Sequence, residues 1–558
     1  MTSNPASTTS SIPYPSSLLQ TTDSAPSSPT NTLLSVNTPS KSNASNRIPD
    51  ASTKCFSYSM VYFYILCHVY YVEDYISVGK QKVRGLVGDD LYLLVAHGKN
   101  YVASNFLVKL AAVLALPVFT RLIDPSGYGL VAVYTSIVGL LSIFFILGFN
   151  NTLLRYYYED KKDFKGFLAS NITFITSLNI LLCALILWNT RTLADFLGVP
   201  GHIVTYGVFT GVVVVFFRIY LSLLQTRKES RLHAVSNSIY FLSITVSSLL
   251  LVLSLKDDPY LGKIYGNLWV SIAAGAFGLA MLFRQSDFGM VDTRHISYSL
   301  RFGLPLVPAA LSQLVLVVFD QVMINKYVDS ASTGLYSFGY QVGSLILMVV
   351  SGLNLAWVAY FYDYSRDKQY ERIEALAQRY VKIILFSALG LIFFSRELVV
   401  LLADPKYYPS LDIVPVIILA QVFSFKANMY RHYSTFHKKT VLVSINTVIA
   451  ALSNIGLNYL LIPVYGYRVA AATTFASYLL LFVLNYLAAR LVIKATTISV
   501  RRLFQSMTPF TFFMLAYVLV QIISESYLLV LSVKTLLLAG LTLTYFHRDL
   551  RKILWNRN

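Results

Sequence analysis

The sequence has little charge and little cysteine, and the signatures of several enzyme classes are missing from it. Asp, Glu, Lys and Arg make up 13% of its 558 residues, roughly half the share in a soluble protein. Its cysteines, Cys55, Cys67 and Cys183, form no Cys-x-x-Cys pair, which argues against a zinc knuckle or a disulfide framework. The sequence contains no Gly-x-x-x-x-Gly-Lys-Ser/Thr loop for a nucleotide and no His-Glu-x-x-His pair for a catalytic metal. We therefore expect no cofactor, no metal site and no catalytic residue, and we do not expect an enzyme.

Long apolar runs dominate the sequence instead. Hydrophobic residues make up 55% of the chain, and its mean hydropathy is +0.58. Each run is long enough to cross roughly 30 Å of hydrocarbon as a helix. The runs predict about fourteen transmembrane helices, near residues 101–121, 128–148, 166–188, 203–224, 234–255, 264–284, 298–325, 333–355, 376–394, 411–431, 440–461, 468–492, 504–523 and 527–546. Because a lipid-exposed strand outside a closed barrel leaves its backbone unpaired, the predicted fold class is an all-α integral membrane protein.

The apolar part of the chain consists of two similar halves. Residues 116–130 return as residues 321–335, a spacing of 205 positions. The aligned landmarks are Arg121 with Lys326, Asp124 with Asp329, Gly129 with Gly334, and, at a spacing of 204, Pro259 with Pro463 and Gly262 with Gly466. In a membrane protein such a duplication indicates two homologous lobes with a transport path between them. The predicted domains are a six-helix N-terminal lobe (100–295), a six-helix C-terminal lobe (296–495), and two additional helices with a cytoplasmic tail (496–558).

The chain before residue 100 has a different composition. Residues 1–54 are rich in Ser, Thr, Pro and Asn, which predicts a disordered tail. Residues 55–99 include an aromatic run at 55–72 that suits a membrane interface better than the hydrocarbon centre. A segment that crosses the membrane and a later start at Met60 are the alternatives.

Membrane topology explains the net charge of +18. Predicted loops on the side where the first span begins carry 28 Lys and Arg residues, against 9 on the opposite side. Because basic loops stay in the cytoplasm, we predict a multi-pass plasma (inner) membrane protein with both termini cytoplasmic. Lys161 and Arg557 are then cytoplasmic, while Asp195 and Lys406 face outward. No basic patch remains unexplained, so we expect no nucleic-acid partner.

Several motifs carry a resemblance to a known family. They are KLAAVLALPVFTRLIDPSGYG at 109–129, GLPLVPAAL at 303–311, FDQVMINK at 319–326 and GLYS at 334–337. In this order they resemble the Wzx-like polysaccharide and O-antigen repeat-unit flippases of the multidrug/oligosaccharidyl-lipid/polysaccharide exporter superfamily. The resemblance covers roughly residues 100–490 and extends to the two extra helices. It implies a MATE-like flippase fold and alternating access. The implied partners are an isoprenoid-diphosphate-linked oligosaccharide, membrane lipids and other polysaccharide assembly proteins.

Basic and amide residues in or beside the spans are the candidate substrate ligands. A charge near the bilayer centre costs about 2.5–3.5 kcal/mol on insertion scales, so such a residue is expected to face a cavity or a partner. Lys109 lies inside the first span with no acidic residue there to neutralise it, and a cationic lumen suits a diphosphate-linked sugar. The candidate substrate-binding residues are Lys109, Arg155, Arg218, Arg301, Lys426, Gln313 and Gln421. The alternatives are snorkelling for Arg218 and Lys426, a positive-inside anchor for Arg155, and inter-helix hydrogen bonds for the glutamines.

One acidic residue and three prolines are further candidates. Asp320 aligns with Ala115 of the first half, so it is an added charge in an otherwise apolar helix. We expect it either to pair with a basic residue of the other lobe or to bind a coupling ion, a proton or Na⁺. Pro117, Pro305 and Pro308 interrupt the first helix of each half, as expected of helices that bend during access switching. A static kink is the alternative.

The predicted function is translocation of an isoprenoid-diphosphate-linked oligosaccharide repeat unit from the cytoplasmic to the outer leaflet. The product would be a cell-surface polysaccharide such as O-antigen or exopolysaccharide. A multidrug cation antiporter of the same superfamily is one alternative, although a lumen rich in Lys and Arg disfavours cationic drugs. A membrane polysaccharide polymerase or ligase is another, although no large outer loop is predicted to carry paired catalytic groups.

Overall fold

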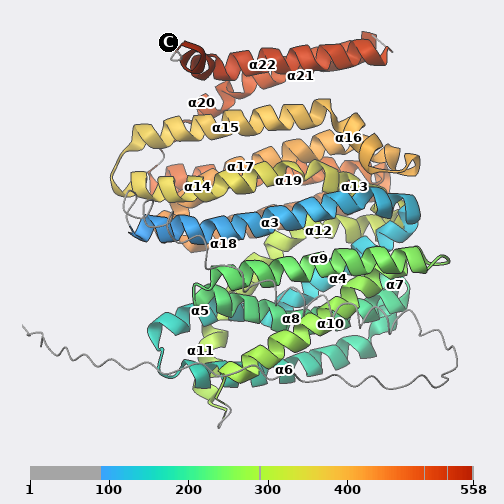
Figure 1. Cartoon of the computed structure of the whole chain (residues 1–558), viewed down its shortest axis with the longest axis vertical. Helices are drawn as coiled ribbons and strands as arrows, with labels where there is room; N and C mark the ends of the chain where they lie inside the picture. The colour runs from blue at the N-terminus through green and yellow to red at the C-terminus, as the bar shows by residue number, and fades with distance from the viewer. Residues whose placement is uncertain (1–88, 288–290, 496, 524–525, 556–558) are drawn as a thin grey trace, which may run out of the picture. The chain divides into compact units, whose positions relative to one another are not determined.

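The computed structural model describes residues 89–558 except 288–290, 496, 524–525 and 556–558. The predicted tail at 1–54, the 55–72 segment with Met60, and Arg557 lie outside these residues. The described residues form helices and connecting turns with no strand among them, and Figure 1 shows the long helices lying side by side. Thirteen helices are long and apolar enough to cross a membrane, and a bent pair makes up to fourteen. The predicted all-α membrane fold is therefore confirmed.

The helices are given in chain order and grouped by the two predicted halves, with α11 crossing the predicted boundary at 295/296. The first half contains α3 (Asp89–Leu122), α4 (Pro125–Ile146), α5 (Phe149–Glu159), α6 (Phe164–Trp188), α7 (Thr190–Leu197), α8 (Gly201–Thr226), α9 (Ser230–Ser254) and α10 (Pro259–Gln285). The second half contains α11 (Thr293–Gly303), η2 (Leu304–Leu306), α12 (Val307–Tyr327), α13 (Ser330–Gly343), α14 (Ile346–Arg366), α15 (Tyr370–Phe393), α16 (Ser395–Leu402), η3 (Pro405–Asp412), α17 (Val414–Phe436), α18 (Thr440–Tyr465), α19 (Arg468–Leu487) and η4 (Ala488–Ile493). The chain continues through α20 (Val500–Gln505), α21 (Met507–Ile523) and α22 (Tyr527–Trp555).

Aspartates start equivalent helices in the two halves. The Oδ1 atom of Asp124 accepts from the backbone N–H of Gly127 at 3.1 Å, at the first turn of α4. The Oδ1 atom of Asp329 accepts from the N–H of Ser332 at 2.6 Å, at the first turn of α13. An N-cap of this kind satisfies backbone donors that a helix start leaves unpaired. The duplicated motif therefore encodes a short turn and a capped helix start in each half.

Two spans break at the same level and touch there. The second span separates into α4 and α5 at Leu147 and Gly148, which have left-handed φ values of 47° and 72°. The seventh separates into α11, η2 and α12 after Gly303. A Cβ on Gly148 would lie 2.7 Å from the carbonyl oxygen of Gly303, so the two breaks pack backbone against backbone.

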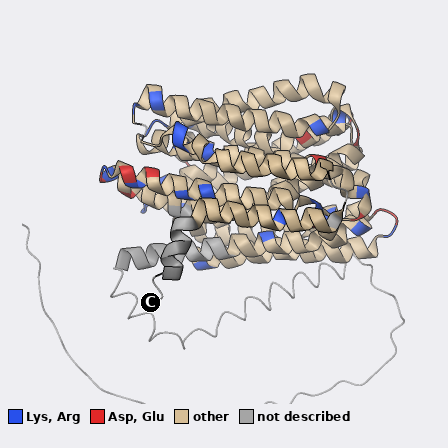
Figure 2. Cartoon of the chain, turned by 90° about the horizontal axis from the view of Figure 1, so that it is seen from above, with Lys and Arg blue, Asp and Glu red and all other residues tan. Residues whose placement is uncertain are grey.

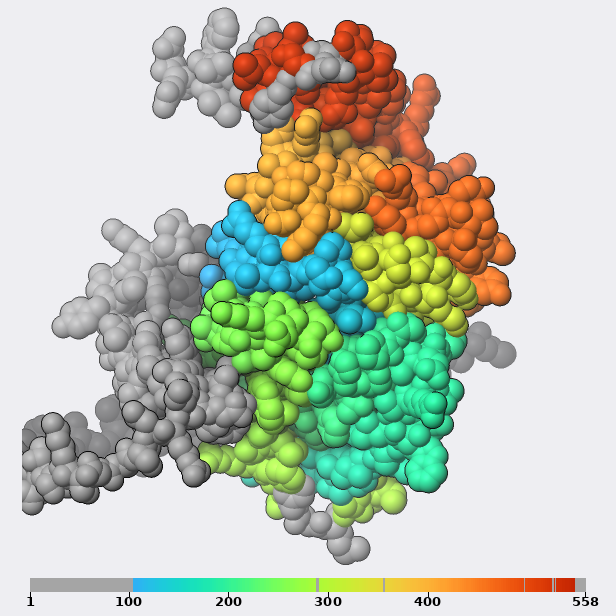
Figure 3. Space-filling view, turned by 90° about the vertical axis from the view of Figure 1, so that its right-hand side faces the viewer, coloured from blue at the N-terminus to red at the C-terminus, as the bar shows by residue number. Residues whose placement is uncertain are grey.

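The first helix of each half packs in the same way within its own half. α3 lies against α9, and α12 lies against α18. Figures 1 and 3 show α3 between α9 of the first half and helices of the second half, and α3 contacts α14 and α16 there. α4 contacts α12 and α13. Two helices of the first half, α3 and α4, therefore form its principal surface toward the second.

Charged residues gather near the ends of the helices, as Figure 2 shows. Several basic residues that the sequence analysis counted among loop charges nevertheless lie within helices. They are Arg218 in α8, Lys263 in the first turns of α10, Lys426 in α17 and Lys534 in α22. Arg218, Lys426 and Lys534 also lie within the predicted spans 203–224, 411–431 and 527–546. Lys263 precedes the predicted span 264–284, because α10 begins earlier than hydropathy indicates.

Candidate functional site

A cavity of about 430 Å³ lies between the two halves. Its walls come from α3 of the first half and from α12, α13, α14, α17 and α19 of the second. The lining residues are Lys109, Ala112, Val113, Leu116, Gln313, Val317, Tyr340, Gln341, Ser344, Leu345, Leu347, Met348, Gln421, Ser424 and Tyr478. Three of the predicted substrate ligands, Lys109, Gln313 and Gln421, are therefore brought together.

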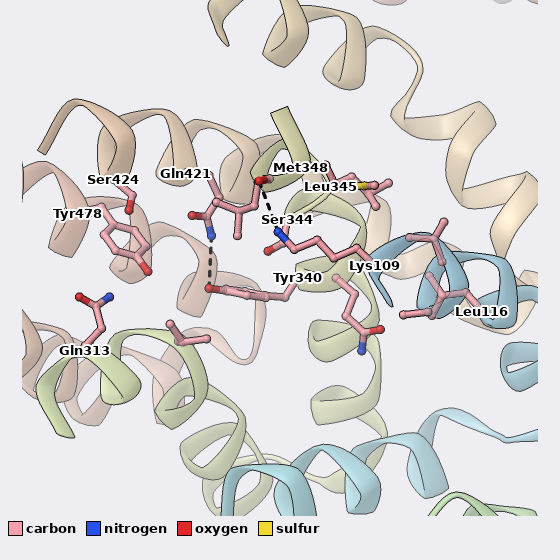
Figure 4. Close-up of a pocket in the computed structure, with 15 residues that line it drawn as sticks. Lys109, Leu116, Gln313, Tyr340, Ser344, Leu345, Met348, Gln421, Ser424 and Tyr478 are labelled. Atoms are coloured by element: carbon pink, nitrogen blue, oxygen red, sulfur yellow. Dashed lines mark hydrogen bonds between the residues drawn. The ribbon is translucent and has the colours of Figure 1, made fainter. Parts of the chain in front are cut away.

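Lys109 is the cation of this cavity. Its side chain is half-buried, and its Nζ lies 3.5 Å from the carbonyl oxygen of Leu347 and 3.4 Å from the Oγ of Ser351. Figure 4 shows it reaching from α3 toward the start of α14. No carboxylate among the described residues forms an ion pair with it. A half-desolvated ammonium with two weak neutral partners can bind an anionic group.

Amides and hydroxyls of the second half form the opposite wall (Figure 4). Gln421 is buried, and its Nε2 donates to the Oη of Tyr340 at 3.3 Å. Gln313, Ser424 and Tyr478 line the same wall. Such groups can exchange hydrogen bonds with sugar hydroxyls, while the apolar lining excludes water from around the cation. The cavity therefore suits an amphiphile that carries both an anion and polar groups.

Four polar residues of this wall were not predicted from the sequence. Tyr340, Gln341 and Ser344 lie on α13 and at its end, and Ser424 lies one turn after Gln421. The spacing of three residues from Gln421 to Ser424 was a usable signal, because such residues share a face of a helix. The contribution of α13 depends on the break after Gly343, which the sequence does not reveal.

Arg218 faces a different cavity. That cavity measures about 340 Å³ and is lined by residues of α4, α8, the α4–α5 break and the start of α12. Asn150, Asn151 and Ser222 add polar groups to it. It shares no lining residue with the Lys109 cavity, so the two cations do not meet.

Arg155 and Arg301 lie outside these cavities. Arg155 is exposed, its Nε pairs with the Oε1 of Glu159 at 2.6 Å, and its guanidinium lies 4.5 Å from the ring centre of Phe302. Arg301 is exposed on the last turn of α11. The structure places neither with the other predicted ligands.

The placement of Lys426 contradicts its predicted role in the lumen. Its side chain is fully buried, its Nζ has no hydrogen-bond partner, and the Nζ lies 5.2 Å and 5.3 Å from the ring centres of Phe423 and Phe504. Gln421 and Ser424 line the cavity on the other side of α17. Because residues two apart on a helix point about 200° apart, Lys426 turns away from the cavity that Ser424 lines.

Asp320 is fully buried within the second half. Its carboxylate accepts from Tyr336 Oη, Thr474 Oγ1 and Asn458 Nδ2, each at 2.5 Å, on α13, α19 and α18. Among the described residues no cation pairs with it, so the predicted pairing with a basic residue of the other lobe is wrong. Neutral donors from three helices surround it instead. The coupling-ion interpretation stays a prediction.

The three prolines occupy different local environments. Pro117 lies inside α3, which continues through it to Leu122. Pro305 lies in the short η2 helix, and Pro308 lies in the first turn of α12, where the missing N–H costs no hydrogen bond. The α-helix of the seventh span is therefore interrupted by a 3-10 turn at its prolines, whereas α3 continues through Pro117.

Lys263 is a cation in the interior that the sequence analysis did not select. It lines a cavity of about 250 Å³ with Asn267, and this cavity shares Ala112, Leu116 and Gln341 with the Lys109 cavity. Its Nζ lies 4.2 Å and 4.6 Å from the ring centres of Tyr128 and Phe119. It precedes the predicted span 264–284 and was therefore counted among the basic residues of the outer loops.

Comparison with known proteins adds a sequence match. Residues 99–365 match the family model described as "Polysaccharide biosynthesis protein". Two relatives from Haemophilus influenzae are similar: "Lsg locus putative protein 1", 22% identical over 281 residues, and an "Uncharacterized membrane protein", 20% identical over 278 residues. Each alignment covers 48% of this chain, and the chain spans 66% and 65% of the length of these relatives.

Two solved structures share the fold. The lipid II flippase MurJ in an inward closed conformation aligns with a TM-score of 0.63 at 15% identity, over 81% of this chain and 99% of that one. An inward-facing multidrug resistance MATE family transporter of the MOP superfamily aligns with a TM-score of 0.57 at 13% identity, over 69% and 94%. The predicted MATE-like flippase fold is confirmed.

Proposed function

We propose that this protein carries a lipid-linked oligosaccharide across the membrane. The proposal rests on its membership of the polysaccharide flippase family in the multidrug/oligosaccharidyl-lipid/polysaccharide exporter superfamily, and on the chemistry of its cavity. The substrate is an isoprenoid-diphosphate-linked repeat unit. It moves from the cytoplasmic to the outer leaflet of the plasma membrane by alternating access of two lobes, residues 100–295 and 296–495. The matched family description and the shared fold support transport of a lipid-linked substrate.

The position of Lys109 carries this proposal. It supplies an unneutralised cation to a cavity between the halves, opposite amides and hydroxyls from Gln313, Gln421 and Tyr478. A diphosphate that leaves water needs a compensating positive charge, and sugar hydroxyls need hydrogen-bond partners. A cationic drug would meet repulsion from Lys109, which disfavours multidrug cation transport.

We assign Asp320 to coupling. Its carboxylate and the hydroxyl oxygens of Tyr336 and Thr474 form a group of oxygen atoms within one lobe. The Nδ2 of Asn458 donates to the same carboxylate, and no described cation pairs with it. Hard cations such as Na⁺ bind to oxygen ligands, and a buried carboxylate can also take up a proton. Either event would change the packing of α12 against α18 and α19, which the carboxylate joins.

Replacement of Lys109 tests the substrate assignment. Lys109→Gln should lower surface polysaccharide per inserted transporter at least tenfold, and Lys109→Arg should keep part of it, because charge is the proposed agent. Lys162→Ala is the control, since Lys162 lies in the exposed loop beside Asp160 and Asp163 and should leave export near normal. Binding of the purified lipid-linked sugar should weaken in parallel. Full export by Lys109→Gln would refute the cationic cavity.

A further inference from the structure

The two copies of the duplicated motif meet in the structure. α4 begins at Pro125 and α13 begins at Ser330, at equivalent positions of the two halves. A Cβ on Gly129 would lie 1.8 Å from the carbonyl oxygen of Ser330, and a Cβ on Gly334 would lie 1.8 Å from the carbonyl oxygen of Pro125. The two helix starts therefore cross backbone to backbone, and the contact is reciprocal.

Glycine is required for this approach. Real Cβ atoms essentially never lie within 3.0 Å of another heavy atom, and here the nearest atom is a backbone carbonyl oxygen. A backbone cannot turn aside as a flexible side chain can, so a methyl group at either position must separate the two helices by roughly an ångström or more. Gly129 and Gly334 thus hold the halves at a distance that no other residue permits.

Hydrogen bonds flank the crossing on both sides. On one side, Asn325 Nδ2 of α12 donates to the carbonyl oxygens of Leu197 and Gly198 at 2.8 Å and 2.9 Å. On the other side, Tyr407 Oη of η3 donates to the carbonyl oxygen of Ile123 at 3.0 Å. Each bond joins the end of a half's first helix to a short segment of the other half. The contact therefore has the approximate twofold pattern that the sequence repeat predicts.

An aromatic cluster lies beside this crossing, because Tyr128 immediately precedes Gly129. The ring centre of Tyr407 lies 5.7 Å from that of Tyr128 and 5.3 Å from that of Phe338, and all three side chains are buried. The Oη of Tyr128 donates to the Oε1 of Gln341, which lines the cavity. The cluster joins both halves and is linked through this hydrogen bond to the wall of the cavity.

We propose that the two copies of the motif form the gate that closes the cavity toward the outer face, with Gly129 and Gly334 as its contact point. The assignment of this face to the outside rests on the proposed function. The state described here has the gate closed. Release of a substrate to this side requires Tyr128 to leave Phe338 and Tyr407, and the glycine crossing must open with it. Bulk at the crossing therefore favours the outward-open state.

Accessibility of the cavity tests the gate. In the full chain, Cys55, Cys67 and Cys183 are replaced by serine, and Val113→Cys places a reporter in the cavity wall. An impermeant thiol reagent is added to intact cells. Gly129→Ala and Gly334→Ala should each raise the labelling rate at position 113 at least tenfold and lower polysaccharide export.

Gly456→Ala is the matched control. Gly456 lies within α18, and a Cβ there would meet no atom within 4 Å, so labelling and export should stay as in the parent. Tyr407→Phe covers the case in which a glycine variant fails to insert. It removes one hydrogen bond and adds no atom, and labelling should rise about fivefold.

The labelling rates at position 113 decide whether the crossing is a gate. Equal labelling of the parent, the inserted glycine variants and Tyr407→Phe would overturn it. Labelling does not involve the sugar, so its result is separate from the substrate assignment. A wild-type protein that shows this gating but carries no lipid-linked oligosaccharide would refute the proposed function and leave the gate standing.

Discussion

The direction of each side chain on α17 decides which of its polar residues can meet a substrate. Gln421 and Ser424 line the cavity, whereas Lys426 lies between Phe423 and Phe504 with its Nζ buried. An ammonium without an ionic partner is costly in an apolar interior, and the two rings offset part of that cost. Lys426 therefore packs within the second half and does not face the cavity.

Replacement of Lys426 should separate packing from transport. Lys426→Met keeps the length of the side chain and removes the buried charge, so stability should be unchanged or higher and export should remain near normal. Gln421→Leu, on the cavity side of the same helix, should reduce export at least severalfold. Thermal unfolding in detergent and surface polymer per inserted protein are the measurements. Loss of export in Lys426→Met with intact folding would return Lys426 to the transport path.

Asp320 should be essential for the cycle without holding the sugar. Asp320→Asn keeps the shape and some hydrogen bonds but removes the negative charge that a coupling cation needs, so export should fall at least tenfold. Binding of the lipid-linked sugar to purified protein should change less than twofold, because Asp320 does not line the cavity. Ser477→Ala, which removes a buried hydroxyl group of α19 that does not contact Asp320, serves as a control. Equal losses of binding and export would place Asp320 in the sugar site instead.

At the scale of helices, the sequence predicted each span but not the breaks within them. Hydropathy over about twenty residues reports burial in lipid, and all the predicted spans are helical. It does not report the left-handed turn at Leu147, nor the break between Gly343 and Ile346 that brings Ser344 to the cavity. Leucine rarely adopts the left-handed conformation, so the sequence does not predict the turn at Leu147. The next residue, Gly148, packs against Gly303, and this contact between distant parts of the chain accompanies the turn. Long-range contacts therefore decided the parts of the site that the sequence missed.

A buried ion pair joins the C-terminal helices to the second half. Lys534 of α22 donates to both carboxylate oxygens of Glu397 at 2.8 Å and 3.1 Å, and its side chain is almost fully buried. Lys534→Ala should destabilise the fold by about 3 kcal/mol, because it leaves the Glu397 carboxylate unpaired. Lys534→Met combined with Glu397→Gln should recover much of that loss.

An exposed pair offers the contrast for this prediction. Arg502 pairs with Glu374 at 2.7 Å, but its side chain is 59% exposed. Arg502→Ala should therefore change thermal stability far less than Lys534→Ala. Similar losses from both variants would show that burial of the ion pair is not what fastens α22.

For the whole molecule, the two halves are similar in fold but differ in chemistry. Lys109 and Asp320 lie on the first helices of the two halves, one facing the cavity and the other buried among α13, α18 and α19. Neither charge has a counterpart in the other half, since Lys109 aligns with Leu314 and Asp320 aligns with Ala115. In the proposed mechanism, duplication supplied the gate, where both copies are needed, and divergence supplied a cation for the substrate and an anion for coupling.

The distribution of basic residues predicts how the whole molecule is oriented in the membrane. Lys161 lies in the loop between α5 and α6, while Asp195 in α7 and Lys406 in η3 lie at the opposite ends of their spans. The excess of basic residues on the side of Lys161 predicts that this side is cytoplasmic. In intact cells, an impermeant thiol reagent should label Asp195→Cys and leave Lys161→Cys unlabelled until the membrane is opened. Lys406 donates to the carbonyl oxygen of Arg121 in the closed gate, so Asp195, which has no part in the gate, is the cleaner reporter. Labelling of position 161 alone would invert the topology, and the gate formed by Gly129 and Gly334 would then close the cavity toward the cytoplasm.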